Sequence, residues 1–190
     1  MYNKIYAGIG SRKTPLLICE VMEKLAIKLA NKDCVLRSGG ARGADTAFER
    51  GCDSVLGVKQ IFYIDKCVQR IQRQDGSILD RESNYSLNSL QEAELLASKY
   101  HPNWNGLSKY IRKLHTRNVF QILGLNLNCY SNFVLCWTPD GAKTETTSKT
   151  GGTGQAIRIA NAYGIKVYNL ADQEDLNVAL NWLGTNNEYI

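Results

Sequence analysis

Short apolar runs alternate with amphipathic stretches along this chain. The helical period is clearest over residues 16–31, where apolar side chains recur at positions 17, 21, 25 and 29. Runs rich in β-branched and aromatic residues predict strands at 5–9, 34–36, 60–64, 132–138 and 165–170. Further helices are predicted at 44–52, 90–100, 107–125, 152–163 and 175–183. Such an alternation is typical of an α/β protein whose strands are mainly parallel.

This order of elements predicts a Rossmann-like three-layer sandwich, in which helices cover both faces of a mainly parallel sheet. We expect a single domain over residues 1–190, because the length favours one domain. Ligands of such sheets bind where loops leave the carboxyl ends of the strands. The glycine-rich loops of this chain follow predicted strands, which makes them the first candidates for function.

The regular pattern breaks between about residues 65 and 110. Most of the first half of this segment is polar and has no clear period, which predicts an irregular insertion or flap beside the ligand edge of the sheet. Ser89 fits the N-cap of the helix at 90–100, and Glu92 stands at its capping-box position.

Composition places the chain among ordinary globular proteins. It has 190 residues, of which 44% are hydrophobic and 22% charged, and it contains only three prolines. No apolar run reaches the roughly 18 residues that a membrane span requires. The amino-terminal residues lack the apolar core of a signal peptide. We therefore expect a cytoplasmic protein that does not bind membranes.

The cysteines and histidines do not indicate a metal site. The six cysteines form no CxxC pair, and the two histidines, His101 and His115, have no neighbouring cysteine with zinc-site spacing. No metal and no cofactor are expected. Four cysteines lie in apolar runs and are expected in the core: Cys19, Cys34, Cys129 and Cys136.

The net charge is +5, and the excess of lysine and arginine lies in the first two-thirds of the chain. After residue 118 the sign reverses. A positive region of this kind suits a partner that carries phosphate, although an ordinary solvated surface has the same composition.

Two glycine-rich loops in the first half of the chain have the chemistry of phosphate-binding loops. The first reads GIGSR and offers Gly10, Ser11 and Arg12 after a strand, but it lacks the third glycine of a dinucleotide fingerprint. The second reads SGGARGAD over residues 38–45 and joins a strand to a helix. Its small residues expose backbone N–H groups where the helix directs its positive end.

A third loop reads TGGTG over residues 150–154 and also precedes a helix. The strand at 132–138 ends just before it, at Thr138 and Asp140. Asp140 is expected either to bind a ribose or to form a Pro-Asp-Gly turn. Three such loops in one α/β domain predict one shared site for an anion or a nucleotide.

Four segments carry a resemblance to a known superfamily. They read GIGSRKTP, LRSGGARGADTAFE, TRNVFQILGLNLNCYSNFVLCW and TGGTGQAIRIANAYGIKVYNL. Together they resemble the superfamily shared by DNA-processing protein A (DprA/Smf) and the LOG nucleotide hydrolases. The second segment looks most like the phosphate loop of DprA, and the resemblance covers the chain apart from about 65–110.

LOG enzymes cleave the N-glycosidic bond of nucleoside monophosphates, and the resemblance places Arg117 at their catalytic arginine. Asn118 stands where these enzymes have lysine, and Arg158 where they have a catalytic glutamate. A cation at that position works against an oxocarbenium-like centre. Asp45, Glu49 or Asp140 would have to replace the missing carboxylate.

Three functions therefore remain open. We place first the binding or sequestration of a phosphate-bearing nucleotide or nucleotide-derived signal, which makes the protein a binding module rather than an enzyme. The alternatives are DprA-like binding of single-stranded DNA, with tyrosine and tryptophan side chains for base stacking, and LOG-like phosphoribohydrolase activity. Ligand contacts are predicted for Gly10, Ser11, Arg12, Ser38, Gly39, Gly40, Ala41, Arg42, Asp45, Arg117, Thr138, Asp140, Gly151, Gly152, Thr153 and Gly154.

The arginines at 12, 42 and 117 are the expected phosphate partners, because a guanidinium group makes bidentate contacts. The apolar helix at 107–125 exceeds what one small sheet face requires, and the resemblance implies assemblies built on such helices. We therefore expect a homodimer or homotetramer.

Overall fold

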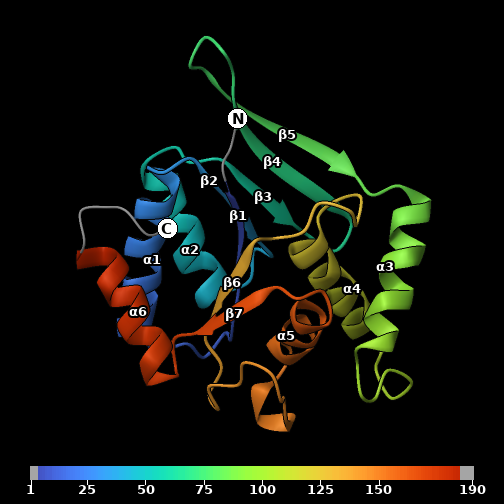
Figure 1. The fold of residues 1–190 in the computed structure, drawn as a ribbon. Helices are drawn as coiled ribbons and strands as arrows, with labels where there is room; N and C mark the ends of the chain where they lie inside the picture. The colour runs from blue at the N-terminus through green and yellow to red at the C-terminus, as the bar shows by residue number, and fades with distance from the viewer. Residues whose placement is uncertain (1–3, 185–190) are drawn as a thin grey trace.

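Five parallel strands form the centre of the sheet in the computed structural model, which describes residues 4–184 (Figure 1). They are β1 (Lys4–Gly8), β2 (Cys34–Ser38), β3 (Lys59–Phe62), β6 (Phe133–Cys136) and β7 (Lys166–Asn169). The full strand order is β5-β4-β3-β2-β1-β6-β7. The chain runs from β1 through β2 to β3 on one side and then returns to β6 and β7 on the other. The order therefore reverses between β1 and β6, which is where α/β sheets open a crevice for ligands.

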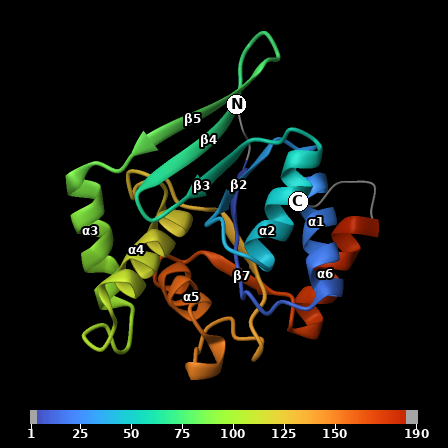
Figure 2. The same cartoon turned by 180° about the vertical axis from the view of Figure 1, so that it is seen from behind.

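Helices cover both faces of the sheet, which confirms the predicted α/β sandwich (Figures 1 and 2). One face carries α1 (Leu16–Ala30), α2 (Ala44–Ser54) and α6 (Gln173–Gly184). The other carries α4 (Lys109–Leu123) and α5 (Thr153–Ala162), and α3 (Leu87–Lys99) packs against α4. Each face has its own apolar core. No helix within residues 4–184 is both long and apolar enough to cross a membrane.

The prediction of an irregular insertion after residue 65 is wrong for most of residues 66–84. β4 (Lys66–Gln72) and β5 (Ile78–Asn84) form an antiparallel hairpin that extends the sheet beyond β3. Ion pairs join the two strands: Arg70 to Asp80 at 2.9 Å and Lys66 to Glu82 at 2.8 Å. Because the cross-strand pairs are polar, the hairpin has no apolar alternation by which it could be recognised.

Helix α3 begins earlier than expected. Its N-cap is Ser86, whose Oγ accepts a hydrogen bond of 3.1 Å from the backbone N–H of Ser89. The predicted N-cap at Ser89 therefore lies inside the first turn. A serine precedes a good helix former at both positions, and only the tertiary arrangement distinguishes the two.

Helix α4 is shorter than the predicted helix at 107–125. Ser108 caps its start, where Oγ accepts from the backbone N–H of Ile111, and Gly124, with φ of +82°, ends it. Its apolar surface is covered by the sheet on one side and by α3 on another. Val119, Phe120, Ile122 and Leu123 are buried within the chain, whereas Tyr110 and Ile111 near the start of the helix are exposed.

Among the four cysteines expected in the core, Cys19, Cys34 and Cys136 are buried, but Cys129 is exposed. The loop that carries Cys129 turns its backbone inward instead. The carbonyl oxygen of Cys129 accepts a hydrogen bond of 2.6 Å from Arg37 Nη1. Arg37 lies on β2 with 2% of its surface exposed, and it also donates from Nε to Gln60 Oε1 at 2.8 Å.

We predict that Arg37→Met lowers the free energy of unfolding by about 2–4 kcal/mol, because methionine keeps the stem but leaves the carbonyl of Cys129 without its charged donor. Urea denaturation measures this change. The exposed Arg73→Met on the hairpin serves as a control and should stay within about 0.5 kcal/mol of the wild type. Equal stability of the two variants would contradict a structural role for Arg37.

Candidate functional site

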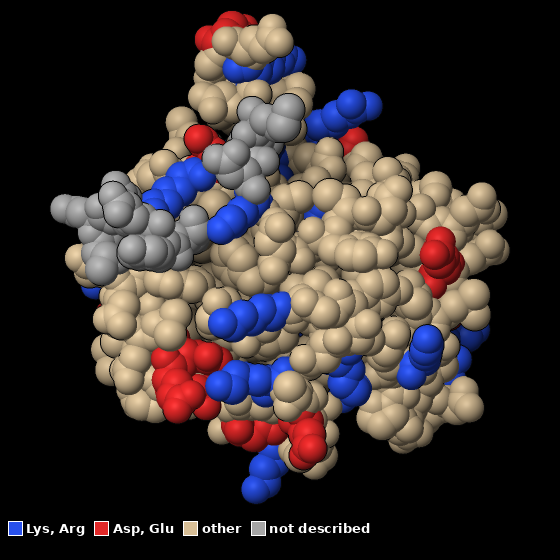
Figure 3. Space-filling view, viewed as in Figure 1, with Lys and Arg blue, Asp and Glu red and all other residues tan. Residues whose placement is uncertain are grey.

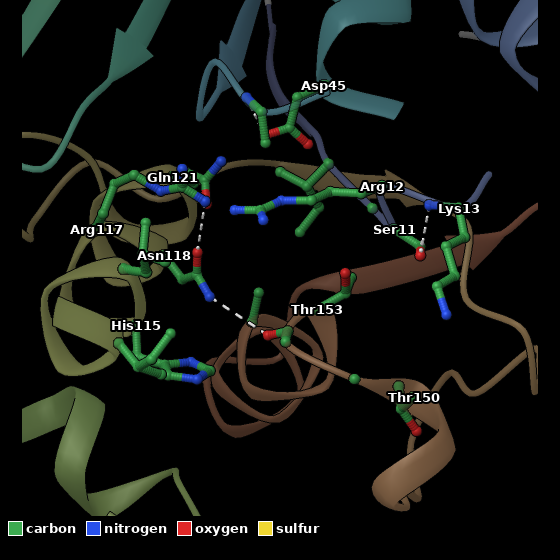
Figure 4. Close-up of a pocket in the computed structure, with 18 of the residues that line it drawn as sticks. Ser11, Arg12, Lys13, Asp45, His115, Arg117, Asn118, Gln121, Thr150 and Thr153 are labelled. Atoms are coloured by element: carbon green, nitrogen blue, oxygen red, sulfur yellow. Dashed lines mark hydrogen bonds between the residues drawn. The ribbon is translucent and has the colours of Figure 1, made fainter. Parts of the chain in front are cut away.

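A cavity of about 540 Å³ opens at the ligand edge of the sheet (Figure 4). The loop after β1, the loop between β2 and α2, helix α4 and the start of α5 all contribute to its wall. Parts of all three glycine-rich loops therefore meet at one place. Nine of the predicted ligand residues line it: Gly10, Ser11, Arg12, Ala41, Asp45, Arg117, Gly151, Gly152 and Thr153.

The remaining predicted residues lie outside the cavity lining. They are Ser38, Gly39, Gly40, Arg42, Thr138, Asp140 and Gly154. Arg42 is exposed on its loop. Ser38 donates its hydroxyl to Glu49 Oε1 at 2.7 Å, and the backbone N–H of Gly40 donates to the same oxygen at 3.0 Å. Glu49 thus fixes the second loop from behind and does not face the cavity.

Asp140 holds the third loop together. Its carboxylate accepts hydrogen bonds from the hydroxyl groups of Thr138 at 2.9 Å, Thr147 at 3.1 Å and Thr150 at 2.5 Å. Of the two roles considered for Asp140, these contacts favour a turn. The carboxylate orders the segment that leads into α5, so that Gly151 and Gly152 face the cavity.

Close packing fixes the first loop against the second. Gly43 has φ of +84°, and a Cβ atom there would lie 2.5 Å from the carbonyl oxygen of Ser11. The same oxygen accepts from the backbone N–H of Ala44 at 3.4 Å and from Thr14 Oγ1 at 2.8 Å. Only glycine has both the conformation and the space that this contact requires.

Arg117 joins α4 to the second loop. Its Nη1 donates to the carbonyl oxygen of Gly39 at 2.7 Å, and its Nη2 donates to Asn118 Oδ1 at 3.2 Å. Its Nε is buried and has no hydrogen-bond partner. A Cβ atom at position 39 would lie 2.6 Å from Arg117 Cζ, so Gly39 must be glycine for the guanidinium to lie there.

A network of side chains continues from Arg117 to α5. Asn118 Nδ2 donates to the carbonyl oxygen of Gly152 at 3.4 Å (Figure 4) and to Gln155 Oε1 at 3.2 Å. The Nδ1 atom of His115 lies 3.1 Å from the same oxygen. Burial lowers the pKa of His115 to about 4, so its ring is neutral at pH 7. His115 therefore contributes shape and hydrogen bonding to the cavity but no charge.

Asp45 is the one acidic residue among the described residues that line the cavity. Its side chain is 2% exposed, and its Oδ2 accepts from the backbone N–H of Ala41 at 3.3 Å. Burial raises the pKa of this carboxyl group to about 6, and the charge of Arg117 partly opposes the shift. The carboxylate takes the place that an anion would otherwise occupy at this loop.

Arg158, which stands where LOG enzymes have glutamate, lies away from the cavity lining. Its Nε donates to the carbonyl oxygen of Tyr100 at 2.6 Å, and its Nη1 donates to the hydroxyl of Thr146. The guanidinium thus connects α5 to the end of α3 and to the segment that precedes the third loop. Of the three carboxylates considered as replacements for the glutamate, Asp45 alone lines the cavity.

Cations surround the opening. Figure 4 shows Arg12 reaching into the cavity toward Arg117 and Asn118. Lys13 and Lys149, both exposed, also line it. The first turn of α5 presents backbone N–H groups that have no partner within the helix. A Cβ atom at Gly151 or Gly152 would meet nothing within 4 Å, so the approach to these groups is open.

Eleven lining residues were not predicted, and five of them lie on α4. Those on α4 are Ile111, Leu114, His115, Asn118 and Gln121, the largest group from any one element, and the others are Ile9, Lys13, Pro139, Lys149, Thr150 and Ala156. The α4 residues follow a spacing of three or four and so share one face of the helix. That stripe is present in the sequence, but the larger apolar periodicity of the same segment conceals it.

We predict that Asp45→Asn raises the free energy of unfolding at pH 7.5 by about 1–3 kcal/mol, because the wild type must keep a buried carboxyl ionised above its raised pKa. Folding binds a proton at Asp45 between about pH 4 and 6, so this advantage of the variant disappears as the pH falls through that window. Urea denaturation at pH 7.5 and pH 3.5 tests the sign, and the titration of His115 cancels in the comparison. A variant less stable than the wild type at pH 7.5 would contradict it.

No protein-family model matches this chain, and no curated protein matches it. A solved structure that resembles it is the X-ray structure of DNA processing protein A (DprA) from Streptococcus pneumoniae, with a TM-score of 0.47 and 18% sequence identity. The match covers 88% of this chain and 50% of that chain, so the present chain spans half the length of that protein.

Proposed function

We propose that this protein binds a phosphate-bearing nucleotide, or a small molecule derived from one, in the cavity between the three glycine-rich loops. The observation that carries the proposal is a pair of buried donors without a partner, Arg117 Nε and Gln121 Nε2, on residues that line a cavity surrounded by cations. Buried donors of this kind are costly unless a partner satisfies them. A ligand rich in acceptor oxygens supplies such partners.

The phosphate is assigned to the side of the cavity formed by Arg12, Lys13, Lys149 and the start of α5. A phosphate brings up to two negative charges, which the side chains and the positive end of the helix complement. The open approach at Gly151 and Gly152 supports close contact with backbone N–H groups. The volume lies within the range of sites for nucleotide-sized ligands.

The rest of a nucleotide would lie against an apolar part of the wall. Ile9, Ile111, Leu114, Pro139 and Ala156 contribute it. None of the described lining residues is a tyrosine, tryptophan or phenylalanine. We therefore assign the base to aliphatic contacts rather than to an aromatic stack.

LOG-like hydrolysis of an N-glycosidic bond is a second candidate, supported by one observation. Asp45 and Arg117 line the same cavity, and the charge of Arg117 acts on the Asp45 carboxyl. An arginine with a carboxylate is the pair that the LOG resemblance implies. Nucleotide recovered chemically intact after incubation with stoichiometric protein supports binding alone, whereas a free base with ribose phosphate supports hydrolysis.

Binding of single-stranded DNA draws less support. On the face in Figure 3 the lysine and arginine side chains stand apart among uncharged residues and do not form a continuous basic strip. A DNA groove combines such a strip with aromatic platforms. Oligo-dT that binds with affinity falling steeply as salt rises, in the absence of binding by mononucleotides, would favour DNA over the proposed ligand.

Assembly into a homodimer or homotetramer stays a prediction. The exposed leucines at 16 and 17 on α1, each more than two-thirds exposed, are apolar surface that such an assembly would bury. Light scattering at tens of micromolar protein checks it, and the mass of a monomer would contradict it.

We predict that Arg12→Ala weakens nucleotide binding about 10- to 150-fold, because a charge-assisted contact contributes roughly 1.5–3 kcal/mol. Calorimetric titration with nucleoside monophosphates measures it. The melting temperature without ligand should hardly change, since Arg12 is exposed.

Arg42→Ala is the matched control. It removes the same charge from the neighbouring loop but from a side chain outside the cavity lining, so its effect on affinity should be small. An equal loss in both variants would indicate general electrostatic attraction instead of a contact in the cavity. The proposal fails if no nucleotide binds.

A further inference from the structure

We propose that the cavity selects ribonucleotides over deoxyribonucleotides, with Asp45 and Gln121 contacting the ribose hydroxyl groups. This inference rests on the proposed function and adds the sugar class of the ligand. It follows from a buried carboxylate in the cavity wall, the one acidic side chain among the described lining residues, and from the unsatisfied donors of Gln121 and Arg117 in the same wall.

Asp45 has capacity that the protein does not use. An ionised carboxylate has about four sites for hydrogen-bond acceptance. Its side chain contributes to the cavity wall and accepts hydrogen bonds from the backbone N–H groups of Ala41 and Gly39, which leaves about two of these sites unused. It forms no salt bridge, although Arg117 lies close enough for its charge to act on the carboxyl group. A buried carboxylate in this state is stabilised by a ligand that donates hydrogen bonds to it.

Gln121 supplies a hydrogen-bond donor, whereas Asp45 supplies an acceptor. Its side chain is 1% exposed, and Nε2 has no partner. A Cβ atom built at position 39 would lie 2.5 Å from Gln121 Nε2, so this donor lies beside Gly39. Asp45 accepts a hydrogen bond from Ala41, two residues further along the same loop. The free amide donor of Gln121 and the free acceptor of Asp45 therefore border the same stretch of the second loop.

A hydroxyl group matches both side chains. It donates one hydrogen bond and accepts others, so it can donate to Asp45 while it accepts from Gln121 or from Arg117 Nε. A fully ionised phosphate cannot, because it carries no donor and is repelled by the Asp45 carboxylate. The phosphate is thus directed to Arg12 and the start of α5, and the hydroxyl-bearing part of the ligand to the second loop.

The 2′-hydroxyl group is then the atom that distinguishes the two classes of nucleotide. A 2′-deoxyribose leaves Asp45 or Gln121 without one of its partners in a site from which water is displaced. Sites that are built to bind a hydroxyl group reject the analogue that lacks it strongly. We expect each ribonucleotide that binds to do so at least about tenfold more tightly than its 2′-deoxy counterpart.

The test compares matched pairs by calorimetric titration at pH 7.5 and constant salt. The probes are the ribonucleoside 5′-monophosphates with their 2′-deoxy counterparts, and ribose 5-phosphate with 2-deoxyribose 5-phosphate. The expected result is preference for the ribose member of each pair that binds. Equal affinity, or tighter binding of the deoxy member, overturns the inference and leaves the proposed nucleotide binding intact. Absence of binding by every probe overturns both.

The variants assign the preference to these residues. Asp45→Asn should reduce the preference to about twofold or less. Glu20→Gln is the control, since it removes an exposed carboxylate of α1 from outside the cavity lining, and it should retain the wild-type preference. Gln121→Leu, which removes the amide donor, provides a second and independent comparison. A preference for ribose that persists in both folded variants would show that neither side chain contacts the 2′-hydroxyl group.

Discussion

The hydrogen bond of 2.7 Å between Arg117 and the carbonyl oxygen of Gly39 is the contact on which the rest of the cavity depends. It joins a helix on one face of the sheet to the loop that follows β2. It also requires the absence of a side chain at Gly39, because a Cβ atom there would meet the guanidinium. From Arg117 the connection continues through Asn118 to the carbonyl oxygen of Gly152. A single hydrogen-bond network therefore fixes the second loop, α4 and the start of α5 relative to one another.

The cavity combines ionisable groups whose ordinary charge states are costly to keep. Burial raises the pKa of Asp45 and lowers that of His115, so burial favours the uncharged form of both side chains. Proteins retain such groups where their chemistry is needed, and perturbed pKa values therefore gather at functional sites. The exposed cations at the opening have no such cost, because water solvates them in the free protein. The buried side chains of Asp45 and His115 therefore lower the stability of the folded protein, whereas the exposed cations at the opening hardly affect it.

Much of the fold could be predicted from the sequence, because glycine-rich loops and apolar runs of fixed period mark where strands end and helices begin. The site could be predicted only in part. Arg12 and Arg42 are the same residue type in similar loops, yet only Arg12 lines the cavity, and residue type alone does not distinguish the two positions. The polar stripe on α4 was hidden because the same helix buries a larger apolar face. The hairpin of β4 and β5 was missed because its strands pair through charges.

That charged hairpin has a consequence for how the molecule behaves among copies of itself. β5 is the last strand of the sheet, and an unpaired edge is a template on which other chains can add strands. The run from Asp80 to Glu82 places three consecutive charges on this edge. Unpaired β-strands that approach it meet charge in place of an apolar surface, so the feature that concealed the strand also protects the protein against aggregation through its longest open edge.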